Sequence, residues 1–397
     1  MIAKLKSIKH NKLYQLSLGK KAIFDSLGIT GKIPNSKTSL DLTFQWIKSS
    51  FDANKDGGSS AYYRFGAGWK GSYPETTGYL IPTIYEYSKF KGNSEWRDLA
   101  KKASDWLLSI QDISGGWQGL QIDEKCDLRV FNSAMILDGL VATYKIENDK
   151  KYLDAAMNGV NWILNKIDSN GFFSENNVSG GGSFDTLVCA CLLMPVQFLE
   201  QNEKQNYVAK ITHALDAHVA LQTENGWFRN CNFHKNDTAL LHHLGYTLDG
   251  LIISSEILEN DVYYLAAKKT ADKLLSKFEV NLELPAFIKS DWSTHNDLGN
   301  TASLCLTGYS QIAIVFQKIY KKENDLRFLS AALKINDIIS SIGNYHSNNN
   351  GISYGLSGSY PINGNYQSYQ MVNWAAKYHA ESLLLSLNAC MSKTTTQ

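Results

Sequence analysis

The stretch that decides the fold is "SEWRDLAKKASDWLLSIQDISGGWQGLQIDEKCDLRVFNSAMILDGLVATY", residues 94–144. Its first part, 94–111, places apolar side chains at helical spacing and charged ones on the opposite face, which is typical of a helix packed on one side. The loop "GGW" follows at 115–117, and "FNSAMILDGLVATY" at 131–144 is apolar on nearly every side, as in a helix buried within an inner layer. The stretch therefore predicts an outer helix, an aromatic loop and an inner helix, in that order.

This unit recurs along the chain at a period of roughly 55 residues. The segment "YLAAKKTADKLL" at 264–275 matches "RDLAKKASDWLL" at 97–108 almost position by position. Six outer helices alternate with six inner ones, and an array of such hairpins either stays open or closes on itself. The sequence predicts an all-α fold of six helical hairpins, with an N-terminal extension at 1–35, one toroid domain at 36–390 and a disordered tail at 391–397.

A repeated loop favours closure of the array into a ring. Gly-Ser-Tyr-Pro occurs at 71–74 and again at 358–361. In a ring the first and last hairpins are neighbours, so matching loops before their inner helices would lie side by side on one rim. The alternative is a chance recurrence of four turn-forming residues. We predict a closed (α/α)6 barrel.

The charge balance argues against several classes of partner. The chain has 39 Lys and Arg residues against 38 Asp and Glu residues, so it offers no basic field for nucleic acid or for an anionic membrane surface. The basic start, "MIAKLKSIKHNKLYQLSLGKK", lacks the apolar core of a signal peptide, and no later run is long enough to span a membrane. We expect a cytoplasmic protein without membrane insertion.

The six cysteines form no CxxC pair and no Cys/His spacing of a structural zinc site. Reduced thiols are the simplest interpretation, since free cysteine is usually buried. The sequence predicts neither a metal nor a cofactor.

A closed double ring of helices leaves a funnel at its axis, and this is the expected binding site. Aligning two inner helices on "LDGL", at 137–140 and 248–251, puts Asn132 and His243 at one level. The same level round the ring holds polar residues in helices that are otherwise apolar, namely Thr76, Asp185, Asn300 and Asn373. Helix capping explains Thr, Asn and Asp at such positions, but it does not explain His243.

Carboxylates and imidazoles at this level suggest acid–base chemistry. Glu75 stands directly before an inner helix, where the helix N-terminus would stabilise a negative charge. Asp185 and Asp297 are further carboxylates at this level, and glycoside hydrolysis uses two carboxyl groups, one as the acid and one as the base or nucleophile. His242 and His243 precede Tyr246 by about one turn, so an imidazole and a phenol could share a face and relay a proton. The alternative for the histidines is burial in the core.

Aromatic and basic residues in the rim loops suit a sugar. The faces of Trp and Tyr rings pack on the apolar faces of sugar rings, although each ring could instead anchor its own loop. A guanidinium group reads carboxylates or phosphates with two hydrogen bonds. The predicted catalytic residues are Glu75, Asp185, His243 and Tyr246, and the predicted substrate-binding residues are Trp69, Tyr73, Arg129, Asn132, His242, Trp292, Asp297, Asn300, Tyr366 and Asn373.

Two stretches resemble a known architecture, "PETTGYLIPTIYEYSKFKGNSEWRDLAKKASDWLLSIQDISGGW" at 74–117 and "HHLGYTLDGLI" at 242–252. They look like the (α/α)6 toroids, which include terpenoid-cyclase-like barrels and six-hairpin glycosidase-like proteins. They are most similar to toroid proteins encoded beside bacterial polysaccharide-assembly genes. The resemblance implies an oligosaccharide or polysaccharide ligand and an association with polysaccharide-assembly enzymes.

A comparison with the motifs of known toroid families leaves three possible functions for this sequence. The DxDD and DDxxD motifs of cyclases and terpene synthases and the Cys-His-Gly element of lanthionine cyclases are absent. Unsaturated glucuronyl hydrolases use two Asp residues at the inner rim, a role that Asp185 and Asp297 could fill. N-acylglucosamine 2-epimerases use a His pair, for which His243 and His379 are available. The leading hypothesis is an enzyme that cleaves glycosidic bonds by hydrolysis or β-elimination, and the alternatives are a sugar epimerase and a non-catalytic toroid that binds a glycan or a partner.

Overall fold

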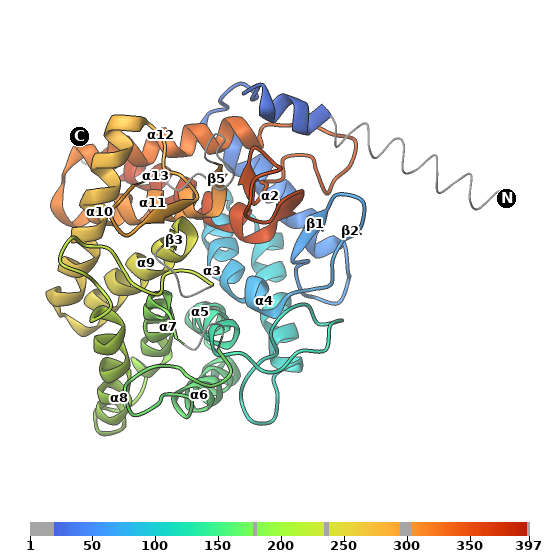
Figure 1. Cartoon of the computed structure of the whole chain (residues 1–397). Helices are drawn as coiled ribbons and strands as arrows, with labels where there is room; N and C mark the ends of the chain where they lie inside the picture. The colour runs from blue at the N-terminus through green and yellow to red at the C-terminus, as the bar shows by residue number, and fades with distance from the viewer. Residues whose placement is uncertain (1–19, 178–180, 234–237, 294–302, 395–397) are drawn as a thin grey trace.

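The computed structural model describes residues 20–177, 181–233, 238–293 and 303–394, with side chains through residue 389. Six inner helices form a closed ring, because each contacts the next in chain order and the last also contacts the first. Figure 1 shows α3, α5, α7 and α9 around the centre of the molecule. The inner helices are α3 (Pro74–Lys91), α5 (Val130–Glu147), α7 (Thr186–Val196), α9 (Leu241–Leu258), α11 (Leu306–Glu323) and α13 (Asn373–Thr394).

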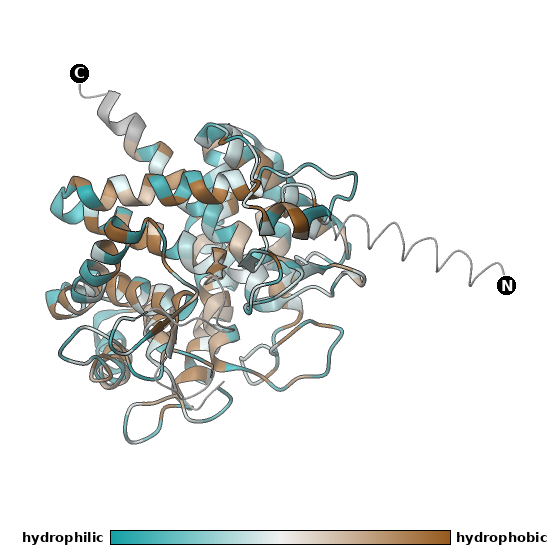
Figure 2. Cartoon of the chain, turned by 45° about the horizontal axis from the view of Figure 1, so that its top comes forward, coloured by the Kyte–Doolittle hydropathy of each residue, from teal (hydrophilic) through white to brown (hydrophobic). Residues whose placement is uncertain are grey.

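Six outer helices cover this ring and alternate with the inner ones along the chain. Asn or Asp side chains at their start, such as Asn93, Asp149 and Asn260, accept a hydrogen bond from a backbone N–H of the first turn. In Figure 2 teal and brown residues alternate along helices at the edge of the molecule, as expected of helices with one polar side. The prediction of an (α/α)6 barrel is confirmed, with the outer helices α2 (Ser36–Asp52), α4 (Ser94–Ser109), α6 (Lys150–Leu164), α8 (Gln201–Val219), α10 (Asp261–Asn281) and α12 (Leu326–Gly343).

Glycines let the inner helices approach closely. A Cβ atom added at Gly139 of α5 would lie 2.3 Å from the carbonyl oxygen of Gly78 of α3. Likewise, a Cβ at Gly250 of α9 would lie 2.3 Å from the backbone nitrogen of Leu187 of α7. No side chain fits at these contacts, so the helix backbones pack directly on each other.

Short strands join the two ends of the ring. β1 (Tyr62–Arg64) pairs antiparallel with β2 (Gly68–Trp69) and with β7 (Gln370–Val372), so the first and last hairpins lie side by side. The first Gly-Ser-Tyr-Pro copy, at 71–74, leads from β2 into α3. The second copy contains β6 (Ser359–Tyr360), which pairs with β5 (Leu304–Cys305), while β3 (Thr238–Leu240) pairs with β4 (Phe287–Lys289).

The ends of the toroid differ slightly from the predicted boundaries. Helix α13 continues to Thr394, beyond the boundary expected at 390, and 395–397 lie outside the described residues. Within the expected N-terminal extension, residues 20–26 are helical. None of the helices in the described ranges is both long and apolar enough to cross a bilayer.

Candidate active site

A cavity of about 700 Å³ opens where the inner helices begin, at the axis of the ring. Its walls come from the first turns of α3, α5, α9 and α13 and from the loops that lead into them. Many of the residues expected from the sequence do line it, namely Tyr73, Glu75, Arg129, Asn132, His242, His243, Tyr246 and Tyr366.

Glu75, in the first turn of α3, contributes a carboxyl group to the wall of this cavity. Its Oε2 accepts hydrogen bonds from the hydroxyl of Tyr73, at 2.8 Å, and from Nδ2 of Asn132, at 2.6 Å. The same Nδ2 also donates to the Tyr73 hydroxyl oxygen, at 2.8 Å. Burial raises the pKa of Glu75 to about 7, although both hydrogen bonds oppose the rise. The carboxyl group can therefore carry a proton near neutral pH and deliver it to a bound molecule.

A hydrogen bond to Gln311 fixes the tautomer of His242. Oε1 of Gln311, on α11, lies 2.8 Å from Nδ1 of His242 and accepts its proton. Burial lowers the pKa of His242 to about 4, so the ring is neutral at physiological pH. With the proton on Nδ1, the lone pair of Nε2 is available as a base.

His243 has a different environment, although it neighbours His242 in the chain. Its ring packs on Phe184 and Phe233, with ring centroids 4.3 and 4.4 Å apart. Its Nδ1 is buried without a hydrogen-bond partner among the described residues. Burial lowers the pKa of His243 well below its usual value, and the ring serves as a neutral wall of the cavity.

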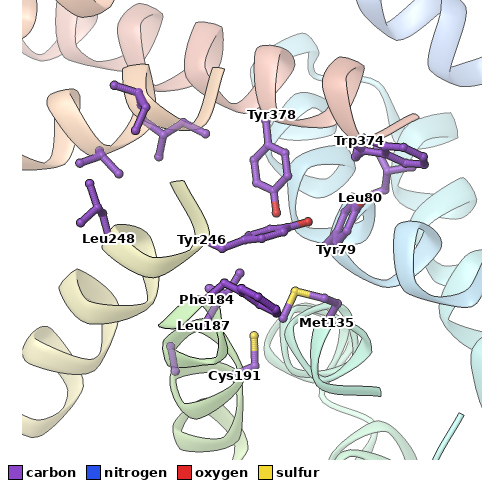
Figure 3. Close-up of a cluster of buried hydrophobic side chains, with 14 of the residues drawn as sticks. Tyr79, Leu80, Met135, Phe184, Leu187, Cys191, Tyr246, Leu248, Trp374 and Tyr378 are labelled. Carbon is purple, nitrogen blue, oxygen red and sulfur yellow. The ribbon is translucent and has the colours of Figure 1, made fainter. Parts of the chain in front are cut away.

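Tyr246 lines the cavity, and two further buried tyrosines lie close to it. Figure 3 shows the side chain of Tyr378, on α13, directed toward Tyr246 on α9, with Tyr79 of α3 beside them. The ring of Tyr246 lies 4.3 Å from that of His242 and 6.0 Å from that of Tyr378. Burial raises the pKa of Tyr246 well above its usual range, so its hydroxyl keeps its proton and can donate it in a hydrogen bond.

The rim of the cavity carries one cation and one further carboxylate. Arg129 stands at the N-cap position of α5 without a side-chain capping hydrogen bond and is half-buried, and no ion pair with it is found among the described residues. Glu124 is exposed in the loop before α5. Among the described residues, the cavity thus offers a guanidinium group to an acidic ligand and one enclosed carboxyl group, that of Glu75.

Asp185 lies behind the wall and does not line the cavity. Its side chain is fully buried, and Oδ2 accepts hydrogen bonds from the Gly182 N–H, at 3.0 Å, and from Nδ2 of Asn177, at 2.8 Å. Nε2 of His218 lies 3.6 Å from the same oxygen. The residue before it, Phe184, faces the cavity instead. This placement supports a role for Asp185 in holding the wall and does not support direct proton transfer.

Several expected rim residues also lie elsewhere. Trp69 packs against Trp46, with ring centroids 5.3 Å apart, and Trp292 covers a groove beside α10. Asn373 is buried and donates to the Ser60 carbonyl at 3.1 Å. His379, on α13, is buried against α2 and α12, where its Nε2 lies 3.2 Å from the Ser340 hydroxyl. His379 therefore does not share the cavity with His243, while Asp297 and Asn300 lie outside the described residues.

Other lining residues were not predicted as site residues. Phe131, Phe184 and Trp374 each stand next to a residue that was singled out on an inner helix. Successive residues on a helix point about 100° apart, so the neighbour of a polar residue can face the cavity as well. The sequence argument considered only the polar residues and therefore missed these aromatic neighbours. Gln311, which holds His242, carries no local signal, because its partner is 69 residues away in the chain.

The described residues contain no group of three or more His, Cys, Asp or Glu side chains that could hold a metal ion. Five cysteines, Cys126, Cys189, Cys191, Cys231 and Cys305, are free thiols. One of these thiols, Cys126, also lines the cavity.

No protein-family model and no curated protein matches the sequence. Solved structures match it in fold. An unsaturated glucuronyl hydrolase specific for heparin is 14% identical, with a TM-score of 0.69 over 90% of this chain and 98% of that one. An unsaturated glucuronyl hydrolase of a Bacillus species is 13% identical, with a TM-score of 0.64 over 88% and 96%.

The cellobiose 2-epimerase of Bacillus thermoamylovorans is 13% identical, with a TM-score of 0.66 over 88% of this chain and 99% of that one. At such identities the likeness concerns the fold. The chain shares its (α/α)6 toroid fold with these proteins.

Proposed function

We propose that this protein hydrolyses a glycosidic bond in an acidic oligosaccharide, with Glu75 as the general acid. The observation that carries the proposal is an enclosed carboxyl group with a pKa of about 7, held by Tyr73 and Asn132 at the wall of a cavity rich in aromatic residues. Such a carboxyl group is protonated in part at neutral pH and protonates a leaving oxygen in glycoside hydrolysis.

His242 supplies the base in this scheme. The proton of Glu75 passes to the glycosidic oxygen as the bond from that oxygen to the sugar carbon breaks. Water adds to the carbon and gives its proton to Nε2 of His242, and both groups then exchange protons with solvent. The pKa of His242, about 4, resembles that of the carboxylate which acts as the base in most glycosidases.

Arg129 and the aromatic walls define the substrate class in this proposal. A guanidinium group without an ion pair among the described residues suits the carboxylate of a uronic acid. Tyr366 and Trp374 present their rings to the cavity, where a sugar ring can pack on them. The structural neighbours include hydrolases named for unsaturated glucuronyl substrates, which makes an unsaturated uronate at the end of the chain the first substrate to test.

The test uses oligosaccharides with saturated and with unsaturated uronate ends. Hydrolysis predicts new reducing ends, and loss of the ultraviolet absorbance of the conjugated double bond for the unsaturated set. Glu75→Gln keeps the shape and the hydrogen bonds but removes the acid, so turnover should fall at least about a hundredfold. Glu86→Gln, an exposed position on the same helix, is the matched control and should retain full turnover.

Two results would contradict the proposal. A rise in absorbance would show β-elimination, in which a base removes a carbon-bound proton and no water is added. Turnover that survives Glu75→Gln would show that another group is the acid.

An epimerase is the second candidate, because a cellobiose 2-epimerase shares the fold and two imidazoles line the cavity. The pair expected from the sequence, His243 with His379, is not supported, since His379 lies away from the cavity. Deuterium uptake from solvent into a product of unchanged composition would favour the epimerase with His242 as the base.

We propose that the reaction takes place in a bacterial cytoplasm, with enzymes of polysaccharide assembly as partners. The free thiols support a reducing compartment. The resemblance of 74–117 to toroid proteins encoded beside polysaccharide-assembly genes supports the association, and co-purification with such enzymes would test it.

A further inference from the structure

The loop at 118–128 folds back on itself beside the cavity. Its two ends are joined by an antiparallel bridge between Gln118 and Leu128. The Ile122 N–H donates to the Ser72 carbonyl at 2.8 Å, which attaches the loop to the segment before α3. Contacts of the backbone at both places give the loop a fixed position on the cavity wall.

Glu124 brings a negative charge from this loop to the open end of the cavity. The loop carries four charged side chains, and among these described residues only Glu124 lines the cavity. Glu124 is exposed, whereas Glu75 is enclosed by its hydrogen bonds to Tyr73 and Asn132. The amide group of Gln121 donates to both carboxylate oxygens of Glu124, at 2.9 and 3.2 Å, in the orientation that pairs its nitrogen with them. The carboxylate of Glu124 therefore has a preferred position at the cavity mouth, although it is open to solvent.

Tyr62, on β1, lines the cavity near this carboxylate. Its side chain is half-buried, and its ring lies 6.4 Å from that of Trp374. Burial and then the charge of Glu124 raise the pKa of Tyr62, while Arg64 opposes the rise and Asp123 adds a smaller increase. Glu124 thus acts on the Tyr62 hydroxyl more strongly than the other two charges, which places carboxylate and phenol close together at the mouth.

Charges of opposite sign follow each other from the inside of the cavity to its mouth. Arg129 is half-buried, and the proposed function gives its guanidinium group to the carboxylate of a uronate. A Cβ atom added at Gly119 would lie 2.5 Å from Cγ of Arg129, so the loop packs directly on this side chain. Glu124 extends from the same loop into solvent. A ligand that places an acidic sugar at Arg129 and continues outward therefore meets the Glu124 carboxylate with its next sugar.

We propose that the cavity mouth is a subsite for an amino sugar with a free ammonium group, and that Glu124 is its specificity-determining residue. This inference rests on the proposed function, because it assumes that the acidic sugar lies at Arg129. A carboxylate accepts strong hydrogen bonds from an ammonium group, and the face of the Tyr62 ring attracts a cation as well. A sulfate group at the same place would lie beside a like charge, which disfavours it.

The test uses three disaccharides that differ in one substituent. In each, an unsaturated uronate is joined to glucosamine, whose nitrogen carries a free ammonium group, an acetyl group or a sulfo group. The charge at this nitrogen is then positive, zero or negative at pH 6. Binding is measured by calorimetry on the Glu75→Gln protein, in which turnover is slow. We expect affinity to fall in that order by at least about fivefold at each step, and the differences to shrink as salt is added, because Glu124 is exposed.

Variants of Glu124 in the same background separate its charge from its shape. Glu124→Gln keeps the size of the side chain and removes the charge, so the three affinities should come within about twofold of one another. Glu124→Lys should reverse the order, with the sulfo form bound most tightly. The matched control is Asp127→Asn, which removes the same charge from an exposed position of the same loop outside the cavity wall. It should keep the order of the Glu75→Gln protein.

Three outcomes would overturn the inference. Equal affinities for the three disaccharides would show that Glu124 is only a solvated surface charge. An order that survives Glu124→Gln would show that another group recognises the nitrogen substituent. Failure to bind any of the three would show that the cavity does not take a uronate joined to glucosamine.

Hydrolysis is judged separately, on the wild type with the same disaccharides. Cleavage with kcat/KM values in the order of the affinities would support both proposals. Binding in the expected order without cleavage would contradict the proposed hydrolysis and leave the amino-sugar subsite in place.

Discussion

At the scale of single residues, burial in the cavity shifts the pKa values of two acid–base groups in opposite directions. Enclosure raises the pKa of Glu75, because its charged form is the anion, and lowers that of His242, because its charged form is the cation. Between these two pKa values the acid is protonated and the base is neutral. Both groups are then in the state that the proposed hydrolysis requires.

The pH dependence of turnover follows from this pair. Activity should rise through a pKa near 4, as His242 loses its proton, and fall above about pH 7, as Glu75 becomes ionised. The measurement is kcat/KM against pH for the wild type, with Glu86→Gln as the control. A profile that stays flat to pH 9 would contradict the assignment of Glu75 as the acid.

Gln311 tests the tautomer of His242 without touching a substrate. Gln311→Leu removes the acceptor of the Nδ1 proton, and kcat should fall about tenfold. Gln311→Glu restores an acceptor and adds a negative charge, which should raise the pKa of His242 and move the acidic limb of the profile upward. A Leu variant with unchanged kcat would show that His242 is not the base.

Burial of Glu75 also lowers the free energy of unfolding at pH values where its carboxyl group is ionised. Its pKa is higher in the folded protein than the ordinary value of 4.5, so the folded state holds the proton more tightly than the unfolded chain. The stability of the wild type should therefore fall as pH rises from about 4.5 to 7 and level off above. Glu75→Gln lacks this penalty and should be more stable than the wild type by about 3 kcal/mol at pH 8. Urea unfolding of both at pH 8 and pH 4 measures this, and the difference should disappear at pH 4.

At the scale of the elements, close contacts between inner helices set the width of the ring. Gly139→Ala puts a methyl group against the Gly78 carbonyl, which belongs to a rigid helix backbone. The gain in helix propensity, about 1 kcal/mol, is smaller than the cost of overpacking, and we expect a net loss of about 2 kcal/mol. Urea unfolding measures this difference.

The control at this scale is Gly343→Ala, at the end of the outer helix α12. There the new methyl group meets only the tip of the Leu356 side chain, at 2.8 Å, which can move aside. Its effect should stay below about 1 kcal/mol. Equal losses at both glycines would show that helix contact does not decide the outcome.

At the scale of the whole molecule, the ring depends on contacts between its two ends. Asn373, at the start of α13, donates to the Ser60 carbonyl at 3.1 Å, and its own N–H donates to the Ala61 carbonyl at the same distance. Asn373→Ala leaves the Ser60 carbonyl without this donor and should cost about 2 kcal/mol of unfolding free energy. Asn281→Ala, at an exposed position at the end of α10, is the control and should change little. An unchanged unfolding midpoint for Asn373→Ala would show that β1–β7 pairing alone closes the ring.

The architecture could be predicted from the sequence because it depends on local patterns. Helical spacing of apolar residues, as in 94–111, and the nearly all-apolar stretch 131–144 distinguish outer from inner helices without knowledge of their neighbours. Repetition of the unit then determines the number of hairpins. The same reasoning placed Glu75 and Asn132 at the cavity, because both stand at the start of inner helices.

Only the tertiary structure decided which side chains meet in the cavity. Phe184 faces the cavity and Asp185 does not, although they are adjacent in the chain, because the rotation of a helix about its axis is set by its packing on neighbouring helices. Gln311 reaches His242 through a contact between segments far apart in the sequence. The sequence by itself determined the hairpins and their order, since these follow from interactions within a few turns. Which acid–base groups meet in the cavity depends on packing between segments far apart in the chain, and local sequence patterns carry no information about such contacts.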